Sequence, residues 1–412
     1  MITMVDKLYK RNLFEKILPL LRTPEAIVIY GSRQVGKTTL MHQLQAHLGP
    51  NTFFIDLEMP DMLALCRAGP EAVQNYLLQK GAEKNGKIYL LIDEIQYLED
   101  PAKYIKLTHD HHPGIKLIVS GSSSFEIRKK FSPSLTGRLL AFELWPLSFE
   151  EFLEFREKSY RLRGENEAAI NRELVPLAEE YIRFGGYPRI VLEEDEQKKK
   201  LYLSQIMDTY IRKDIRDIGN IRDIGAFNRL LEVLSAQSGQ LLNASALSQI
   251  SGLSRPTVEG YLELLEKTFV IRRLTPFSGN KQGEIYKNPK LYMADTGLMH
   301  LLWLKEFPKV ILGPSFETFA YLELEKTGRG MHFWRTNNRQ EVDFILEGEP
   351  LYAIEAKLNF NSTSARHLQT FSGLYTCRTE VVGLHGDKNG KYVWEMAKEI
   401  EEGTARKGPM RG

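Results

Sequence analysis

The sequence contains few cysteines and no long apolar run. Only Cys66 and Cys377 occur among 412 residues, and they lie far apart in the chain. This scarcity argues against a disulfide framework and against a cysteine-ligated metal site. No apolar stretch approaches the roughly 18 residues that a membrane-spanning helix needs. Residues 1–21 mix charged with apolar residues and lack the apolar segment of a signal peptide, so we expect a cytoplasmic protein with no membrane partner.

The sequence also lacks a strong charge imbalance. Its formal net charge is +2 and its pI is near 8.2, so the overall charge neither requires nor excludes a nucleic-acid partner. Hydrophobic residues make up 42% of the chain and charged residues 26%, which is typical of a globular protein. A chain of 412 residues exceeds one ordinary hydrophobic core, so we expect two to four domains.

A phosphate-binding motif follows the first strongly apolar segment. Residues 26–30 form an apolar, β-branched run that leads into Gly-x-x-x-x-Gly-Lys-Thr, and a helical pattern follows. Glycines let backbone N–H groups turn toward anionic oxygens, and the helix directs its positive N-terminal end to the same place. We therefore predict a nucleotide-binding loop made of Gly31, Ser32, Arg33, Gln34, Val35, Gly36, Lys37, Thr38 and Thr39.

The loop and a second apolar segment predict the chemistry of the site. Lys37 is expected to reach the β- and γ-phosphates, and the Thr38 hydroxyl is expected to bind Mg²⁺. The apolar run 87–92 is typical of a strand buried on both faces of a parallel sheet, and it ends in Asp93 and Glu94. Because ligands bind at the carboxyl ends of such strands, we predict that Asp93 holds Mg²⁺ through water. Glu94 is predicted to orient or deprotonate the attacking water.

A third buried strand is predicted at 114–119, and small hydroxyl residues follow it. A polar side chain at this strand end can contact the γ-phosphate or the attacking water, so Ser120 or Ser122 is the candidate. An ordinary serine-rich turn is the alternative.

The order of these motifs resembles the AAA+ superfamily. The P-loop is followed by Leu-Leu-Ile-Asp-Glu at 90–94, by a strand with Ser-Gly-Ser, and then by the segments 134–138 and 144–149. Together with Phe-Gly-Gly-Tyr-Pro-Arg at 184–189 and the segment 210–215, they resemble the bacterial and archaeal AAA+-like ATPases whose C-terminal region is a domain of unknown function. The resemblance implies ATP as the nucleotide and is compatible with a homo-oligomer.

The resemblance also implies roles for two arginines. Arg138 resembles an arginine that reaches the γ-phosphate, either in cis or from a neighbouring subunit. A guanidinium suits this role because it stays charged and offers a rigid fork of donors. Arg189 resembles the sensor arginine of a helical lid. The alternatives are a surface arginine after a glycine turn and a structural Pro-Arg turn.

The pattern between 241 and 273 predicts a helix-turn-helix with a following wing strand. Residues 243–250 form an N-capped helix, and after a glycine turn a second helix has proline in its first turn. Ser254, Arg255 and Thr257 would lie where a recognition helix meets a DNA groove. Winged helices also serve as protein-interaction modules, so a protein partner is the alternative to DNA.

A second acidic constellation lies near the C-terminus. Residues 341–346 and 352–357 read as antiparallel strands, which would bring Asp343 beside Glu355 and Lys357. Two carboxylates and an amine suit Mg²⁺ binding and activation of a water for phosphodiester attack. Charged residues alternating on an exposed hairpin are the alternative, although the apolar flanks of both strands argue against it.

This constellation is similar to the PD-(D/E)xK nuclease pattern, in which an Asp on one strand precedes Glu-x-Lys on the next. Glu317 matches the acidic residue often found on the preceding helix of those nucleases. Val342 replaces the proline of the short Pro-Asp form, a departure that concerns cleavage and not the fold. The resemblance implies a restriction-endonuclease-like α/β domain and two further Mg²⁺ ligand positions, Asp343 and Glu355, beside Glu317.

We therefore predict an α/β protein with four parts. They are a P-loop AAA+-like parallel-sheet core with an N-terminal helix at 1–150, a helical lid or linker at 151–235, a winged helix at 236–280 and a nuclease-like domain at 281–412. The predicted function is binding and hydrolysis of ATP with Mg²⁺, coupled to action on nucleic acid, expected to be DNA. The alternative is an ATP-dependent switch that binds DNA or a protein partner without nuclease activity.

Overall fold

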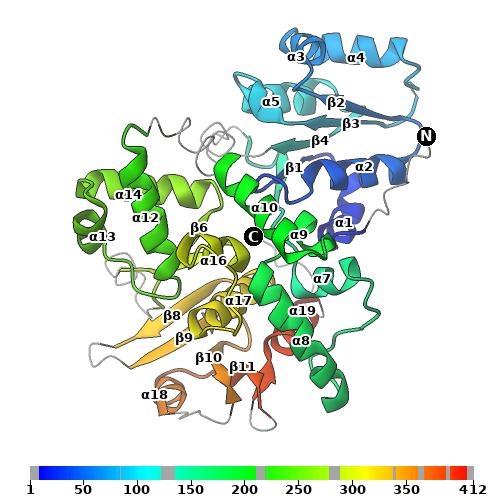
Figure 1. Cartoon of the computed structure of the whole chain (residues 1–412). Helices are drawn as coiled ribbons and strands as arrows, with labels where there is room; N and C mark the ends of the chain where they lie inside the picture. The colour runs from blue at the N-terminus through cyan, green and yellow to red at the C-terminus, as the bar shows by residue number, and fades with distance from the viewer. Residues whose placement is uncertain are drawn as a thin grey trace. The chain divides into compact units, whose positions relative to one another are not determined.

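The structure is a computed structural model of the whole chain (Figure 1). It describes residues 9–83, 85–121, 135–209, 219, 221–277, 288–336, 340–360, 366–386 and 390–405. The chain divides into two compact units, Met1–Trp145 and Pro146–Gly412. In the described part of the chain, no helix combines the length and the hydrophobicity needed to cross a membrane.

The first unit contains a five-stranded sheet in the order β2-β3-β4-β1-β5, and all neighbouring strands are parallel. The strands are β1 (Ala26–Tyr30), β2 (Thr52–Asp56), β3 (Ile88–Asp93), β4 (Ile115–Gly121) and β5 (Leu139–Glu143). The predicted parallel α/β sheet is confirmed. Because β1 is an inner strand, the loop that follows it emerges between the ends of β4 and β5.

Helices cover both faces of this sheet. They are α1 (Asn12–Ile17), η1 (Leu18–Arg22), α2 (Lys37–Leu48), α3 (Pro60–Arg67), α4 (Pro70–Gln79), η2 (Ile95–Tyr97) and α5 (Pro101–His111). Val28, Ile92 and Val119 pack into one core with apolar side chains of α3, α4 and α5. Figure 1 shows α1 and α2 on the opposite face of the sheet.

The second unit begins with four helices that pack together with a later helix, α16 (Thr296–Trp303). The four helices are α7 (Phe149–Phe155), α8 (Ala168–Phe184), α9 (Pro188–Leu192) and α10 (Glu196–Ile206). The buried Asp295 caps α16 by accepting a hydrogen bond from Leu298 N at 2.8 Å, and it also accepts one from Gly186 N at 2.7 Å. A Cβ at Gly185 would overlap this carboxylate. The Phe-Gly-Gly motif thus permits close packing between the end of α8 and the start of α16.

Three helices and a hairpin follow in the middle of the second unit. They are α12 (Ile224–Ala236), α13 (Ala244–Ser251), α14 (Arg255–Lys267), β6 (Ile271–Leu274) and β7 (Lys290–Met293). The predicted caps are present: the Asn243 side chain accepts hydrogen bonds from two backbone N–H groups of α13, and the Ser254 side chain accepts one from Thr257 N. The structure therefore contains the two predicted helices, the turn between them and the strand that follows.

Strand pairing and helix packing cross two of the predicted domain boundaries, and the four-part division stays a prediction. A boundary at 281 would separate β6 from β7, but these strands pair antiparallel, with Ile271 opposite Met293. A boundary at 236 would fall at the end of α12, whose buried face packs in one core with α13, α14 and α16. The described residues between 224 and 303 therefore share one core, because apolar packing continues past residue 236 and backbone hydrogen bonds join strands on either side of residue 281.

The C-terminal part of the second unit is a mixed sheet in the order β12-β11-β10-β9-β8. Its elements are α17 (Gly313–Glu325), β8 (Met331–Arg335), β9 (Glu341–Leu346), β10 (Tyr352–Asn359), α18 (Arg366–Leu374), β11 (Arg378–His385), β12 (Lys391–Tyr392) and α19 (Val393–Ala405). Strands β8, β9 and β10 are antiparallel, whereas β11 runs parallel to β10. The predicted antiparallel pair formed by β9 and β10 is present.

Candidate functional site

The loop between β1 and α2 is shaped for close approach to an anion. Gln34 and Gly36 have positive φ angles of 63° and 96°, which turn the backbone sharply before α2 begins. A Cβ at Gly31 would overlap the carbonyl oxygen of Leu144, so only glycine fits there. No side chain caps the N-terminus of α2, whereas Asp100 caps α5 in the same unit. Because the N-cap residue is Gly36, this position supplies no side-chain acceptor for the first N–H groups of α2.

Lys37 opens α2 and is almost completely buried. Its ammonium donates hydrogen bonds to the carbonyl oxygens of Gly31 at 3.0 Å and Ser32 at 2.8 Å. Burial lowers the pKa of Lys37 to about 8, although the nearby carboxylates of Glu94 and Asp93 oppose this shift. A bound phosphate would favour the charged ammonium, so anion binding and protonation of Lys37 should be linked.

We expect nucleotide affinity to fall with rising pH because of this linkage. Above pH 8 the free protein loses the Lys37 proton, and binding must then take up a proton, which weakens affinity by about tenfold per pH unit. The dissociation constant should therefore be flat from pH 7.5 to 8 and rise between pH 8 and 9.5. Calorimetry in two buffers of different ionisation enthalpy measures the proton uptake. Residual binding by Lys37→Arg should show no such pH dependence, and an equally steep curve there would refute the assignment.

Asp93 connects the end of β3 to the end of the P-loop through a side-chain hydrogen bond. Its side chain is buried, and its Oδ2 accepts a hydrogen bond from the Thr38 hydroxyl at 2.6 Å. Its Oδ1 accepts hydrogen bonds from Glu94 N at 3.0 Å and from the Ser120 hydroxyl. Ser120 therefore contacts Asp93 directly and holds that carboxylate in place. Ser122, the other predicted hydroxyl, lies outside the described residues.

Glu94 follows Asp93 in an unusual backbone conformation. Its φ of 56° and ψ of 48° lie in the left-handed region, which few residues other than glycine adopt. Its Oε2 accepts a hydrogen bond from the side-chain amide of Gln96. Backbone strain of this kind is found preferentially at functional sites. Sequence reasoning missed Gln96, although its position two residues after Glu94 was a usable signal.

Arg11 is a second residue of the site that sequence reasoning missed. Its buried guanidinium donates hydrogen bonds to the carbonyl oxygens of Val35 at 2.6 Å and Trp145 at 2.7 Å. It therefore links the P-loop to the segment that follows β5. No local pattern indicates this contact, because the three residues come from widely separated parts of the chain.

Arg138 lies at the edge of the sheet opposite the P-loop. Its carbonyl oxygen accepts a hydrogen bond from Ala26 N, at the start of β1, and its Nε lies 2.8 Å from Asp110 Oδ1. The P-loop follows the opposite end of β1, at least about 13 Å away at roughly 3.3 Å per residue. Because β1 and β5 are parallel, the start of one cannot meet the end of the other. A role on a neighbouring subunit's nucleotide stays a prediction.

Arg189 has a packing partner within the second unit. Its guanidinium carbon lies 3.6 Å from the ring centroid of Tyr202 on α10, a cation–π contact between neighbouring helices. This contact accounts for the position of its side chain. The predicted sensor role stays a prediction.

The predicted C-terminal constellation converges on the β9–β10 pair. Asp343 Oδ2 accepts a hydrogen bond from Ala356 N at 3.0 Å and lies 3.8 Å from Lys357 Nζ. Glu355 is 2% exposed, and its Oε2 has no hydrogen-bond partner among the described residues. Burial raises the pKa of Glu355, and Asp343 adds to this effect while Lys357 and His367 oppose it. The three predicted side chains are therefore neighbours.

Lys290, which the sequence analysis did not predict as a site residue, lies among three carboxylate groups. Lys290 Nζ lies 2.6 Å from Glu341, 3.2 Å from Glu317 and 3.5 Å from Asp343. Burial lowers the pKa of Lys290, but these three carboxylates outweigh burial and hold that pKa above its ordinary value. The Tyr292 hydroxyl donates a further hydrogen bond to Glu317 at 2.8 Å.

This arrangement does not fit the predicted Mg²⁺ ligand set. Among the residues that the structure describes, no three or more His, Cys, Asp or Glu side chains are arranged to hold a metal ion. Glu317 and Asp343 instead face the ammonium of Lys290, which neutralises part of their charge. The assignment of Glu317, Asp343 and Glu355 as metal ligands stays a prediction.

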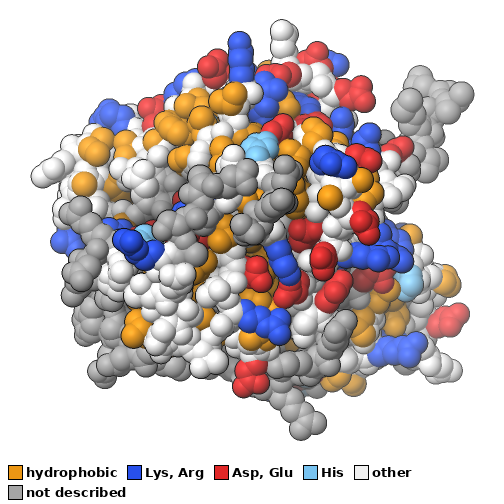
Figure 2. Space-filling model, turned by 90° about the horizontal axis from the view of Figure 1, so that it is seen from below, with side chains coloured by type: hydrophobic (Ala, Val, Ile, Leu, Met, Phe, Trp, Pro, Cys, Tyr) orange, Lys and Arg blue, Asp and Glu red, His pale blue; other side chains and the backbone are white. Residues whose placement is uncertain are grey.

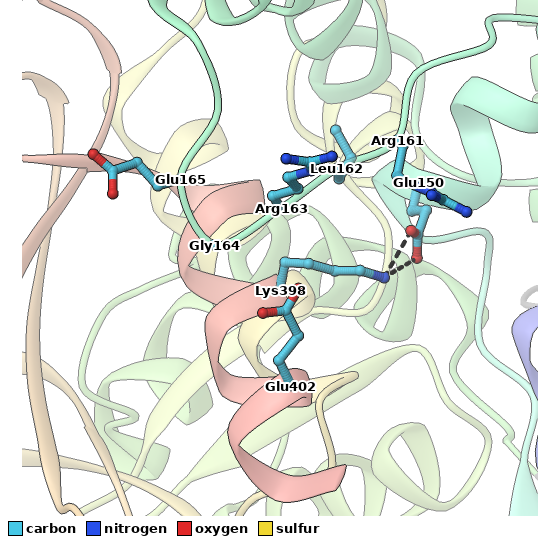
Figure 3. Close-up of a pocket in the computed structure, with 8 residues that line it drawn as sticks. All are labelled: Glu150, Arg161, Leu162, Arg163, Gly164, Glu165, Lys398 and Glu402. Atoms are coloured by element: carbon cyan, nitrogen blue, oxygen red, sulfur yellow. Dashed lines mark hydrogen bonds and ion pairs between the residues drawn. The ribbon is translucent and has the colours of Figure 1, made fainter. Parts of the chain in front are cut away.

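An open pocket of about 560 Å³ lies elsewhere in the second unit (Figure 3). Residues 161–165 line it together with Glu150, Lys398 and Glu402. Lys398 donates hydrogen bonds to both carboxylate oxygens of Glu150, at 2.7 and 2.8 Å. Three basic and three acidic side chains line the pocket, so their charges cancel and favour neither a cation nor an anion.

Charges are also balanced on the predicted recognition helix. Arg255 forms an ion pair with Glu259 at 2.9 Å, and Lys267 pairs with Glu263 one turn later. In the face drawn in Figure 2, acidic and basic side chains of the described residues are interspersed. Helix α14 therefore does not present the concentrated positive charge that drives non-specific DNA binding.

The loop, the buried lysine and the Thr38–Asp93 contact on a parallel sheet define a P-loop nucleotide-binding domain. Residues 23–153 match a family described as AAA domain. Residues 175–309 and 312–397 match two families, each described as a domain of unknown function, DUF8612 and DUF4143.

Several curated proteins are similar to this chain over most of its length. An uncharacterized protein of Methanocaldococcus jannaschii is 28% identical over 367 residues, which cover 87% of this chain and 79% of that protein. One from Haemophilus influenzae is 26% identical over 399 residues, which cover 91% of this chain and 96% of that protein. One from Mycobacterium tuberculosis is 26% identical over 373 residues, with 88% and 76% covered.

Solved structures resemble the chain only loosely. The Thermotoga maritima RuvB Holliday junction branch migration motor has 20% identity and a TM-score of 0.31, with 65% of this chain and 91% of that chain covered. AMPPCP-bound DnaA from Aquifex aeolicus has 17% identity and a TM-score of 0.26, with 62% and 86% covered.

Proposed function

We propose that this protein binds ATP with Mg²⁺ and hydrolyses it at the P-loop of the first unit. The hydrogen bond between the Thr38 hydroxyl and Asp93 Oδ2, beside the buried Lys37 ammonium, is the observation that carries the proposal. It joins the end of the loop to the end of β3, where an NTPase needs its metal and water-handling groups. The AAA match of residues 23–153 supports the same conclusion.

The residues present fit a magnesium ion. The Thr38 hydroxyl and the Asp93 carboxylate are hard oxygen donors of the kind that Mg²⁺ prefers, and Ser120 keeps Asp93 oriented. When bound, Mg²⁺ neutralises charge on the β- and γ-phosphate oxygens. Lys37 then contacts the same phosphates, and Glu94, oriented by Gln96, accepts a proton from or positions the attacking water.

Glu94→Gln is expected to separate binding from turnover. The amide keeps the size and the hydrogen bonding of the side chain but is a poor base, so we expect turnover to fall about 100-fold or more while nucleotide affinity changes less than about threefold. Steady-state phosphate release and fluorescent-nucleotide binding measure the two quantities. Glu71→Gln, on the exposed side of α4, is the matched control and should behave as wild type. Wild-type turnover in Glu94→Gln would remove Glu94 from this role.

For the second unit we propose action on nucleic acid, with DNA as the partner. The helix-turn-helix formed by α13 and α14 and the adjoining β6–β7 hairpin match the layout of a winged helix. The alternative is a nucleotide-driven switch that binds DNA or a protein partner without cutting. The paired charges of α14 favour a protein partner within that alternative, and the ammonium among the C-terminal carboxylates favours the absence of cutting.

Cleavage of phosphodiester bonds is a second candidate activity for this unit. The observation that favours it is the convergence of Asp343, Glu355 and Lys357, together with a buried Glu355 oxygen that has no hydrogen-bond partner among the described residues. We expect any cleavage of labelled single- or double-stranded DNA, with Mg²⁺ or Mn²⁺ and with or without ATP, to be lost in Asp343→Asn. ATP turnover should stay intact in the same variant, because Asp343 is remote from the P-loop in sequence and lies in the other unit. Persistent cleavage would refute this assignment, and ATP turnover without cleavage would favour the switch.

A further inference from the structure

The guanidinium of Arg11 joins two backbone carbonyls that lie far apart in the chain. Its Nη1 donates a hydrogen bond to Val35 O at 2.6 Å, and its Nη2 donates one to Trp145 O at 2.7 Å. Arg11 is only 5% exposed and occupies the N-cap position of α1, whose Leu13 and Ile17 side chains are buried. The side chain therefore reaches the P-loop from a helix start that is held by packing.

The contact with Val35 also fixes the direction of the next backbone N–H group. The peptide bond between Val35 and Gly36 is trans, and in a planar trans peptide the C=O and the N–H point in opposite directions. Because Arg11 holds the carbonyl oxygen, the N–H of Gly36 points away from the guanidinium. This N–H has no hydrogen-bond acceptor among the described residues. It is therefore available to a ligand.

The same peptide unit could rotate if nothing held it. Gly36 has a φ of 96°, and glycine adopts positive and negative φ at similar cost, so rotation next to it meets little steric resistance. Rotation would turn the Val35 carbonyl oxygen, which carries partial negative charge, to the side where a phosphate needs an N–H donor. It would also leave the buried Arg11 guanidinium without one of its acceptors, which is unfavourable. Arg11 therefore opposes this rotation.

We propose that Arg11 is a positioning residue of the nucleotide site, which holds the Val35–Gly36 peptide with its N–H toward the phosphates of the bound nucleotide. This inference rests on the proposed function and names the residue that sets the geometry of the loop. Lys37 contacts the phosphates directly, whereas Arg11 acts through the backbone. The N–H contact is made in the ground state and in the transition state alike, so its loss raises KM and leaves kcat nearly unchanged.

Kinetics and phosphate binding of Arg11→Met test this role. Methionine keeps an unbranched apolar side chain and removes the donors. Because a hydrogen bond to a charged phosphate is stronger than one between neutral groups, we expect KM for MgATP to rise about tenfold, with kcat within about threefold of wild type. Affinity for magnesium pyrophosphate, which lacks base and ribose, should fall by the same factor. Phosphate release and calorimetry measure these quantities. Arg11→Lys keeps the charge without the planar fork, so its KM should lie between those of wild type and Arg11→Met.

Gln43→Met is the matched control. Gln43 lies on α2, and its Nε2 donates a hydrogen bond to Tyr9 O at 2.6 Å, so it also ties the N-terminal segment to this helix. It does so beyond the loop and leaves the Val35 carbonyl held by Arg11. This variant should lower the Tm, as Arg11→Met does, but its KM should stay within about threefold of wild type.

Three results would overturn the positioning role. They are an unchanged KM in Arg11→Met, an equal rise of KM in Gln43→Met, and an unchanged pyrophosphate affinity in Arg11→Met. If Arg11→Met does not fold, Arg11→Lys takes its place, and its KM should still rise at least about threefold because an ammonium lacks the fork that spans both carbonyls. A wild-type protein that binds neither MgATP nor magnesium pyrophosphate would overturn the proposed function, and this inference with it.

Discussion

Lys37→Met is expected to weaken MgATP binding by about 100-fold or more and to abolish measurable turnover. The variant loses a buried ammonium that already lies beside the loop and that would make charge-assisted hydrogen bonds to the phosphates. Each such bond contributes about 1.5–3 kcal/mol, and a 100-fold loss corresponds to about 2.7 kcal/mol. Equilibrium binding of a fluorescent ATP analogue and phosphate release are the measurements.

Lys116→Met is the matched control for this experiment. Lys116, on β4, is a second buried lysine of the first unit. Burial also lowers its pKa to about 8, and it donates hydrogen bonds to three carbonyl oxygens. Those carbonyls belong to residues 20–25, which precede β1, at the edge opposite the P-loop. Its loss should lower the Tm but leave nucleotide affinity unchanged within about threefold. If both variants lose affinity equally, the effect comes from destabilisation, and Lys37 has no special role at the phosphates.

Gly297→Ala is expected to destabilise the second unit by about 3 kcal/mol or more. A Cβ at this position in α16 would overlap the carbonyl group of Phe184 at the end of α8. The obstacle is backbone and cannot rotate away, so either the contact between the two helices opens or the helices shift, and either change disrupts a packed core. Asp295, which caps α16 and accepts a hydrogen bond from Gly186 N, would move with it.

Gly260→Ala is the matched control for the glycine substitution. Gly260 also lies inside a helix, α14, but a Cβ there would meet no other atom within 4 Å. Because alanine has the higher helix propensity, this change should stabilise the protein by up to about 1 kcal/mol. Thermal unfolding followed by circular dichroism compares the two variants. A stable Gly297→Ala protein would show that α8 and α16 do not pack as closely as described.

Local sequence determined the features that depend on short-range backbone geometry. The sequence alone predicted the Gly-rich loop between an apolar strand and a helix, the continuous apolar strands and the two capped helices. Turns, caps and periodicity depend on residues that are close together in the chain. The pair of antiparallel strands that brings Asp343 beside Glu355 and Lys357 could be predicted for the same reason. The chemical roles assigned to these residues stay predictions.

Only the tertiary structure decided which charged groups meet. Arg11 reaches Val35 across the first unit, Ser120 orients Asp93, and Lys290 enters a carboxylate cluster that the sequence had suggested for a metal. Strand order likewise placed Arg138 at the edge opposite the P-loop. Such contacts join residues far apart in the chain. Their strength depends on burial and on distances of a few ångströms, and neither quantity is written in a local pattern.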